Sequence, residues 1–289
     1  MNDVLTQDHE PTRRVRRDPM TGQTSPTGQD ALVRVSGLGK TYRSTTGVET
    51  TALTGVDFGV AAGEFVSIVG PSGCGKTTLM KITAGLISPT VGTVDYRGTG
   101  GPVRPGTYGM VFQGPALLPW HTVEENIMLP ARILGLDMAW ARDRVPDLLE
   151  LVRLGGQGTK YPRELSGGMQ QRVAIARALL PDPEVLFMDE PFGALDAMTR
   201  EELNMSLQAV HLAERKTVVF VTHSISEAVL LSDRVIVMSA RPGAVIDQVA
   251  IPSDRPRDMV NLGEPRFHEA QVRIREGLSG AVDSQRSNP

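Results

Sequence analysis

The sequence predicts an α/β fold with a mainly parallel sheet, an N-terminal antiparallel β subdomain and an inserted helical subdomain. Three short runs, 65–69, 185–188 and 218–221, are apolar almost without interruption, as is typical of strands that are buried on both faces of a parallel sheet. Helical patterns lie between these runs, which favours the α/β class. Residues 31–60 instead alternate apolar and polar side chains between glycine turns, which indicates short strands of an antiparallel sheet.

The composition is that of a globular protein that does not cross a bilayer by itself. Of the 289 residues, 40% are hydrophobic and 22% are charged, which excludes a wholly disordered chain. No run approaches the roughly 18 consecutive apolar residues of a membrane-spanning helix. The formal net charge of -3 provides no positive field that would attract nucleic acid. The single cysteine, Cys74, cannot form an internal disulfide and suits the reducing cytosol.

The chain is predicted to divide into a tail, a folded core and a C-terminal extension. Residues 1–30 are polar, and no apolar segment follows their arginine cluster, which excludes a twin-arginine export signal. We predict a disordered tail there, and a weak contact of the arginines with anionic lipid headgroups is the alternative. The core spans 31–250, and an amphipathic stretch near 267–278 predicts a helical extension over 251–289.

A helical subdomain is predicted at about 114–168, inserted between elements of the sheet. Thr122 followed three residues later by Glu125 predicts a capping box that begins one helix. Pro146 suits the first position of a second helix, and Gly155 would end that helix.

A phosphate-binding loop directly follows the first buried strand. It consists of Gly70, Pro71, Ser72, Gly73, Cys74, Gly75, Lys76, Thr77 and Thr78. Glycines let the backbone curl so that its N–H groups and the N-terminus of the following helix point at phosphate groups. Lys76 is then placed to reach the β- and γ-phosphates, and Thr77 to bind Mg²⁺. We therefore predict a nucleotide site on a P-loop NTPase core.

Two carboxylates, Asp189 and Glu190, end the second buried strand, at the edge where open α/β sheets bind ligands. We expect Asp189 to share Mg²⁺ with Thr77. Glu190 is then available as the general base that polarises an attacking water, because phosphoryl transfer depends on positioning and charge neutralisation. The alternative is a strand that merely ends in two solvated acids.

His223 follows the third buried strand and lies at the same predicted sheet edge, where it could donate to a γ-phosphate. Ser224 with Glu227 predicts a capping box immediately after it. A lone histidine is more often structural, so this placement alone does not decide its role.

A further motif, LSGGMQQR at 165–172, opens a predicted helix with a serine and two glycines, which together can bind an anion. Its candidate binding residues are Ser166, Gly167, Gly168, Met169 and Gln170. The phosphate loop already provides one phosphate site in the same chain. The motif resembles the signature of ATP-binding-cassette (ABC) ATPases, and this resemblance implies that it completes the ATP site of a second copy in a head-to-tail dimer.

The resemblance covers about 32–238, with every element in order, and makes 31–250 an ABC ATPase domain. It implies that Tyr42 stacks on adenine and that Gln113 senses Mg²⁺ and the lytic water. It also implies that Asp196 lies in a loop that crosses the dimer, and that His223 is a switch residue. The cofactors implied are ATP and Mg²⁺, with Thr77, Gln113 and Asp189 as metal ligands.

Local details resemble the ATPase subunits of nitrate, sulfonate and taurine importers: LLPW at 117–120, DEPFGALDAMTR at 189–200 and SARPG at 239–243. The resemblance implies a transmembrane permease whose coupling helix docks near Trp120, and, indirectly, an extracytoplasmic solute-binding protein. It places the chain at the cytoplasmic face of the inner membrane. His121 departs from the apolar residue expected after Trp120.

Two alternatives remain open. Subunits of other ABC importers and of exporters share the same ATPase core. A free-standing ABC ATPase in nucleic-acid metabolism is the more distant alternative, because the sequence has no second phosphate loop, no long heptad insertion, no zinc-spaced cysteine set and no basic domain. We therefore expect no nucleic-acid partner. The solute is not encoded here, since the permease and the binding protein select it.

Overall fold

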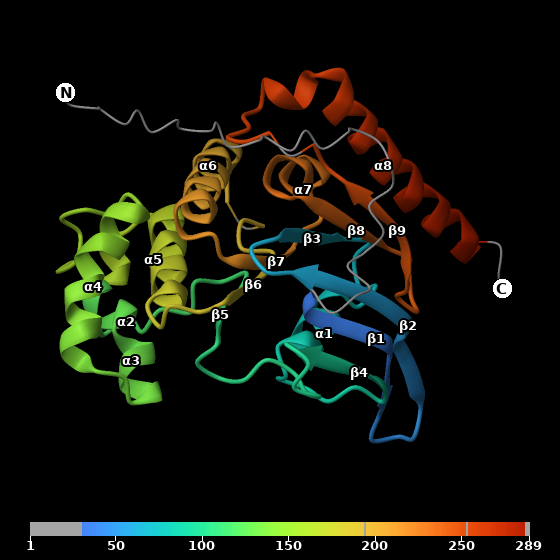
Figure 1. The fold of residues 1–289 in the computed structure, drawn as a ribbon, viewed down its shortest axis with the longest axis horizontal. Coiled ribbons are helices and arrows are strands. Elements are labelled where there is room, and N and C mark those ends of the chain that lie inside the picture. Colours follow the sequence, from blue (N-terminus) through green and yellow to red (C-terminus); the bar gives the residue numbers. More distant parts are fainter. Residues whose placement is uncertain (1–30, 194, 253, 287–289) are drawn as a thin grey trace, which may run out of the picture.

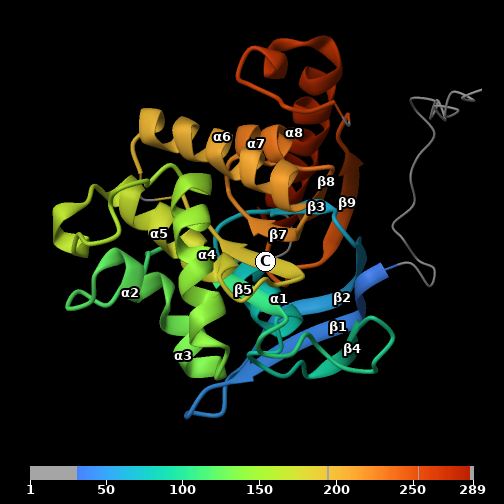
Figure 2. The same cartoon turned by 60° about the vertical axis from the view of Figure 1, so that its left-hand side comes forward.

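The computed structural model describes residues 31–193, 195–252 and 254–286, so the predicted tail lies outside the described residues. The described part contains a three-stranded sheet in the order β2-β1-β4 and a six-stranded sheet in the order β5-β6-β7-β3-β8-β9. Figures 1 and 2 show α6, α7 and α8 over one face of the six-stranded sheet and the three-stranded sheet with α1 against the other. This arrangement confirms the predicted α/β class.

The three-stranded sheet is the predicted antiparallel β subdomain. Its strands are β1 (Ala31–Arg43), β2 (Glu49–Ala61) and β4 (Val91–Tyr96), and β1 pairs antiparallel with both others. In β1, Val33 and Val35 are buried, whereas Arg34 between them is only half-buried. These valines share a hydrophobic cluster with Leu79 of α1 (Lys76–Thr83), so the subdomain and the phosphate loop's helix pack as one unit.

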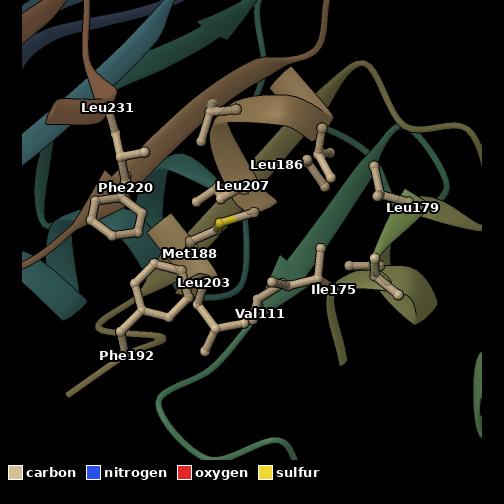
Figure 3. Packing of buried hydrophobic residues seen from close by; sticks show 14 of the residues in the cluster. Val111, Ile175, Leu179, Leu186, Met188, Phe192, Leu203, Leu207, Phe220 and Leu231 are labelled. Atoms are coloured by element: carbon tan, nitrogen blue, oxygen red, sulfur yellow. The ribbon is translucent and has the colours of Figure 1, made fainter. Parts of the chain in front are cut away.

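The six-stranded sheet is mainly parallel, as predicted. Its strands β3 (Phe65–Val69), β5 (Tyr108–Val111), β6 (Val185–Asp189), β7 (Thr217–Val221) and β8 (Arg234–Met238) run parallel, and β9 (Val245–Ala250) pairs antiparallel with β8 at one edge. In β6, Leu186 and Met188 pack in the cluster that contains Leu203 of α6 (Figure 3), whereas Val185 and Phe187 face the three-stranded sheet. Both faces of this strand are therefore buried.

The inserted helical subdomain is confirmed, and its elements group at one end of the molecule (Figure 1). They are α2 (Val123–Ile127), α3 (Leu129–Leu134), α4 (Met138–Leu151), the 3₁₀ turn Pro162–Glu164 and α5 (Gly167–Leu179). The predicted capping box is present: the Thr122 hydroxyl accepts from the Glu125 N–H, and the Glu125 carboxylate accepts from the Thr122 N–H.

The predicted start of the second helix is wrong. Pro146 lies inside α4, which begins eight residues earlier at Met138. The Asp137 carboxylate caps this helix by accepting from the N–H groups of Ala139 and Trp140. A proline inside a helix removes one backbone hydrogen bond. Here the Asp137 cap and the burial of Val145, the residue before the proline, hold the helix together.

The chain beyond β9 packs onto the helices that cover the sheet. These helices are α6 (Ala197–Glu214) and α7 (Ile225–Leu231), and the chain beyond β9 itself forms the 3₁₀ turn Asn261–Gly263 and α8 (Pro265–Arg286). The fully buried Arg257 guanidinium donates to the carbonyls of Val229, Leu230 and Ser232 at the end of α7, which would otherwise lack partners. Among the described residues, no helix combines the length and the apolar character needed to cross a membrane.

His211 on α6 is a buried imidazole at the base of this helical layer. It is 6% exposed, and its ring meets that of Phe65 edge-on at 5.3 Å. Because a carbonyl oxygen can only accept, the contact of Nδ1 with the Lys216 carbonyl at 3.1 Å places a proton on Nδ1. Burial, with a smaller contribution from Arg255, lowers the pKa of His211 from 6.5 to about 4.

We expect acid to destabilise the fold partly through His211. The unfolded chain binds a proton there near pH 6.5, whereas the folded protein does so only near pH 4, so the stabilisation is complete above pH 6.5 and is lost as the pH falls toward 4. The loss is roughly 3 kcal/mol, at about 1.4 kcal/mol per pKa unit. In His211→Gln, whose amide can still donate to the Lys216 carbonyl, the free energy of unfolding from urea titrations should fall less steeply over this range. Equal slopes for both proteins would contradict the assignment.

Candidate functional site

The predicted phosphate loop connects β3 to α1, and its shape depends on glycine. Gly75 has a φ of 104°, and a Cβ there would lie 2.8 Å from a methyl carbon of Leu53 and 3.0 Å from the carbonyl oxygen of Ala52. Only glycine therefore fits between the loop and β2. The Cys74 thiol is buried, and burial raises its pKa, so this residue contributes through its backbone and not as a nucleophile.

Lys76 supplies the positive charge of the loop. Its Nζ donates to the carbonyl oxygens of Gly70 and Pro71 at 2.9 and 3.0 Å, and the residue is buried. These bonds keep the ammonium group within the curl of the loop. A charge held there neutralises phosphate oxygens that bind to the loop's N–H groups.

A cavity of about 360 Å³ opens beside the loop. Its lining includes Tyr42, Thr50, Ala52, Ser72, Gly73, Gly75, Lys76, Thr77, Thr78, Glu190 and Arg241. Tyr42 is half-exposed, and its hydroxyl lies 3.5 Å from that of Thr78. The aromatic ring expected to stack on adenine and the loop expected to bind phosphates therefore line one cavity, as a nucleotide requires.

Thr77 and Asp189 meet at the edge of this cavity. The Thr77 hydroxyl donates to Asp189 Oδ1 at 3.0 Å. Burial raises the pKa of Asp189, and the neighbouring Glu190 carboxylate raises it further, while the Thr77 hydrogen bond opposes the shift. A divalent cation would offset this charge crowding. A hydroxyl and a carboxylate oxygen fit Mg²⁺, which prefers oxygen ligands and takes few of them from the protein when phosphates and water complete its shell.

Glu190 and His223 form the second pair at this edge. Glu190 Oε2 lies 3.3 Å from His223 Nδ1, and the two side chains are 26% and 54% exposed, so solvent can reach the pair. Glu190 has a φ of 45°, in the left-handed region that a residue with a Cβ rarely adopts. Its N–H donates to the Val221 carbonyl at 2.9 Å. This bond to β7 holds the strained residue beside His223.

Gln113 reaches the same place from the end of β5. A Cβ built on Gly193 would lie 3.3 Å from Gln113 Nε2 and 3.7 Å from Glu190 Oε2. Both side chains therefore lie against the small space above Gly193. Gly193 is not among the site residues predicted from the sequence. Its position three residues after Glu190 is the sequence signal that could have identified it as a site residue.

The loop that carries His223 is held differently from the prediction. Ser224 does cap α7, because its hydroxyl accepts from the Glu227 N–H at 3.3 Å. The reciprocal bond of the predicted capping box is replaced: the buried Glu227 carboxylate accepts from the Thr222 hydroxyl at 2.6 Å, and the Ser224 N–H donates to that hydroxyl. Burial raises the pKa of Glu227, and the hydrogen bond from the Thr222 hydroxyl opposes this shift.

The signature residues lie at the start of α5. The Ser166 hydroxyl caps the helix by accepting from the Met169 N–H, and Ser166 and Gly167 are exposed. Gly168 is buried, and a Cβ there would lie 2.3 Å from a methyl group of Thr199. Gln170 does not point to solvent: its Nε2 donates to the carbonyls of Pro162 and Leu165. Its side chain therefore stabilises the turn before the helix.

Among the described residues, no signature residue lines the cavity beside the phosphate loop. Asp196 is also outside it: its carboxylate caps α6 by accepting from the Thr199 N–H at 3.0 Å, and this bond lowers its pKa. The structure thus brings together the residues of the loop, Tyr42, Asp189, Glu190, His223 and Gln113, and separates them from the signature and Asp196.

Arg241 lines the cavity although it is not among the predicted site residues; in the sequence it was noted only as part of the SARPG motif at 239–243. Its Nε and Nη2 donate to the Gly73 carbonyl at 3.2 and 3.0 Å, and its side chain lines the cavity. Two residues on, a Cβ on Gly243 would lie 2.0 Å from the Cys74 carbonyl oxygen. The turn after β8 therefore packs directly against the phosphate loop, and only a glycine at position 243 permits this close approach.

Trp120 lies in the loop before α2, away from the cavity. It is 69% exposed, and the adjacent His121 pairs with Glu125 at 3.2 Å. A tryptophan packed in the core would be buried, so this side chain is available for a contact outside the chain.

Comparisons with known sequences identify the family. The sequence pattern of the ABC transporter family matches residues 53–193. An uncharacterized ABC transporter ATP-binding protein of Methanocaldococcus jannaschii is 47% identical over 213 residues, which cover 73% of this chain and 79% of the relative. The aliphatic sulfonates import ATP-binding protein SsuB of Bacillus subtilis is 44% identical over 228 residues, covering 79% of this chain and 87% of the relative.

A solved structure agrees with these sequence matches. The dimeric structure of a post-hydrolysis state of an ATP-binding cassette, bound to ADP and Pi, superposes with a TM-score of 0.66 at 33% identity. It covers 77% of this chain and 100% of the matched chain. With relatives matched over most of their own length and a nucleotide site assembled on the same fold, the chain belongs to the ABC transporter family as one of its ATP-hydrolysing subunits.

Proposed function

We propose that the chain powers a membrane importer of small organic anions, of which aliphatic sulfonates are the favoured class. The observation that carries the ATPase part of this proposal is the convergence of Thr77, Asp189, Glu190 and His223 on one sheet edge beside the phosphate loop. The sulfonate class is supported by the name of the Bacillus subtilis relative. The local motifs at 117–120, 189–200 and 239–243 support it as well.

Hydrolysis is assigned to residues of one chain. Tyr42 holds the adenine, and Lys76 and the loop's N–H groups hold the phosphates. Thr77, Asp189 and Gln113 would hold Mg²⁺, which supplies charge neutralisation at the phosphate oxygens when bound. Glu190 takes the proton of the attacking water, and His223 orients this carboxylate and donates toward the γ-phosphate.

A second copy of the chain completes the site. Ser166, Gly167, Gly168 and Met169 would meet the γ-phosphate of ATP held by the other copy, while Gln170 supports the turn behind them. Asp196 would lie near the dimer's centre. This head-to-tail arrangement is supported by the separation of the signature residues from their own chain's cavity. The dimeric assembly of the matched cassette supports it too.

The remaining partners follow from transport. Trp120 and its exposed surroundings would receive a helix of the transmembrane permease at the cytoplasmic face of the inner membrane. An extracytoplasmic solute-binding protein would deliver the solute to that permease. No nucleic-acid partner is proposed.

The experiment that tests the import assignment uses proteoliposomes containing the permease, the chain with ATP inside and the binding protein outside. We expect ATP-dependent uptake of ethanesulfonate that exceeds nitrate uptake at equal concentration. If the complex takes up another solute and no sulfonate, the proposed solute class is wrong. Outward movement of solute would make the complex an exporter.

We expect Glu190→Gln to bind ATP but to hydrolyse it slowly. The amide keeps a hydrogen bond to His223 but cannot accept the proton from water, so turnover should fall by roughly 10²–10⁴-fold. With ATP held, the variant should accumulate as a dimer in light scattering. Glu202→Gln, on the exposed face of α6, is the control and should behave as the native protein. A Glu190→Gln protein that stays monomeric with saturating ATP would argue against the sandwich dimer.

We expect Trp120→Ala to uncouple transport from hydrolysis. Losing this exposed aromatic contact should weaken permease binding by about 2 kcal/mol or more, as at interface hot spots, while the distant nucleotide cavity stays intact. Solute uptake by the complex should fall, and ATP turnover by the isolated subunit should not. Trp140→Ala is the matched control, because Trp140 is the chain's other tryptophan and is 41% exposed on α4. Parallel loss of both activities with a lowered Tm would identify Trp120 as a structural residue instead.

A further inference from the structure

The helix that begins with the signature residues also contacts the loop that carries Gln113. Gln171, in the second turn of α5, is 2% exposed, and its Nε2 donates to the Phe112 carbonyl at 3.1 Å. Phe112 immediately precedes Gln113. The first end of the loop is therefore attached to α5 by a buried amide.

The other end of the loop is attached to the same helix. Arg177 Nη1 donates to the Ala116 carbonyl at 2.7 Å, and Nη2 donates to the Pro115 carbonyl at 2.8 Å. Ala116 has a φ of 46°, in the left-handed region, so the guanidinium binds the loop where its backbone is strained. A planar guanidinium can reach two neighbouring carbonyls at once, which the single ammonium of lysine does less well.

Gln113 thus lies between two points that are both held by α5. The strand that precedes it, β5, ends at Val111, before the first of these points. Figure 1 shows α5 between β5 and the helices α2 and α4. Ser166 and Arg177 lie at opposite ends of this helix, a distance of about 16 Å at 1.5 Å per residue. A helix of this length moves as a rigid element, so a displacement at its N-terminus reaches the loop.

We propose that Gln171 and Arg177 are positioning residues that tie Gln113 to the signature helix. When ATP held by the second copy docks on Ser166 and Gly167, the position of α5 is set, and these two side chains carry that position to Gln113 in the chain's own site. Each bound ATP therefore helps to order the catalytic residues of the other ATP site in the dimer. This inference rests on the roles proposed above for the signature and for Gln113.

The test uses the full chain as the ATP-dependent homodimer and measures ATP turnover against ATP concentration. Arg177→Lys keeps the charge but loses the two-carbonyl contact. We expect kcat to fall about tenfold or more, as displaced catalytic groups lower rates, and the Hill coefficient for ATP to fall toward 1. The affinity for ADP should stay within about twofold, because the phosphate loop is untouched. Gln171→Met removes the other attachment at similar volume and should have the same effects.

Arg172→Lys is the matched control on the same helix. Arg172 pairs with Glu202 at 3.3 Å and, among the described residues, makes no hydrogen bond to the Gln113 loop, so the same substitution should leave kcat and the Hill coefficient unchanged. Thermal melting of each variant separates positioning from folding: if Arg177→Lys melts several degrees lower, Gln171→Met decides the outcome.

A double-mutant cycle separates this inference from the function on which it rests. If Arg177 acts through Gln113, then Arg177→Lys should cause little further loss of kcat in a Gln113→Ala background. Fully additive losses, or a native Hill coefficient in both attachment variants, would overturn the inference. If Gln113→Ala alone keeps native turnover, the proposed role of Gln113 fails instead.

Discussion

The parallel pairing of β3, β7 and β6 is the constraint on which the candidate site depends. Because these strands lie side by side and run in one direction, their carboxyl ends form one edge of the sheet. The phosphate loop follows β3, Asp189 ends β6, and His223 follows β7, so Thr77 and Asp189 become neighbours although they are 112 residues apart in sequence. The register Asp189 with Val221, continued by the bond from the Glu190 N–H to the Val221 carbonyl, then fixes Glu190 beside His223.

This edge concentrates features that destabilise a fold. Burial and the adjacent Glu190 carboxylate raise the pKa of Asp189, and Glu190 adopts a φ of 45°. Such strain and charge crowding persist only where the surrounding structure over-determines them, and they gather at functional sites. The rigid sheet provides that support here, and a bound cation would offset the charge.

The phosphate loop and the signature residues lie in two separate parts of the chain, and the signature residues do not line the cavity beside the loop. The loop lies between the sheets, whereas the signature opens α5 at the border of the helical subdomain. If both bind phosphate as proposed, two copies of the chain can share two nucleotides, which is the physical reason to propose the dimer. In that dimer α5 would have two roles. Its N-terminus would contact the nucleotide of the second copy, and its side chains bind the Gln113 loop beside the chain's own nucleotide site.

Short-range patterns in the chain were enough to predict the sheet type, the phosphate loop, the two carboxylates and the signature. These patterns are consecutive apolar runs, glycine spacing and helix caps. The positions of Asp189 at the end of β6 and of Lys76 in the phosphate loop could be predicted without coordinates for that reason. Local patterns did not predict the contact of Arg241 with Gly73, the half-buried Arg177 bound to the Gln113 loop, the place of Pro146 inside α4 or the Thr222 partner of Glu227. Each of these features depends on tertiary packing, which decides which distant groups lie within hydrogen-bonding distance of a polar side chain. A local sequence pattern contains no information on such distances.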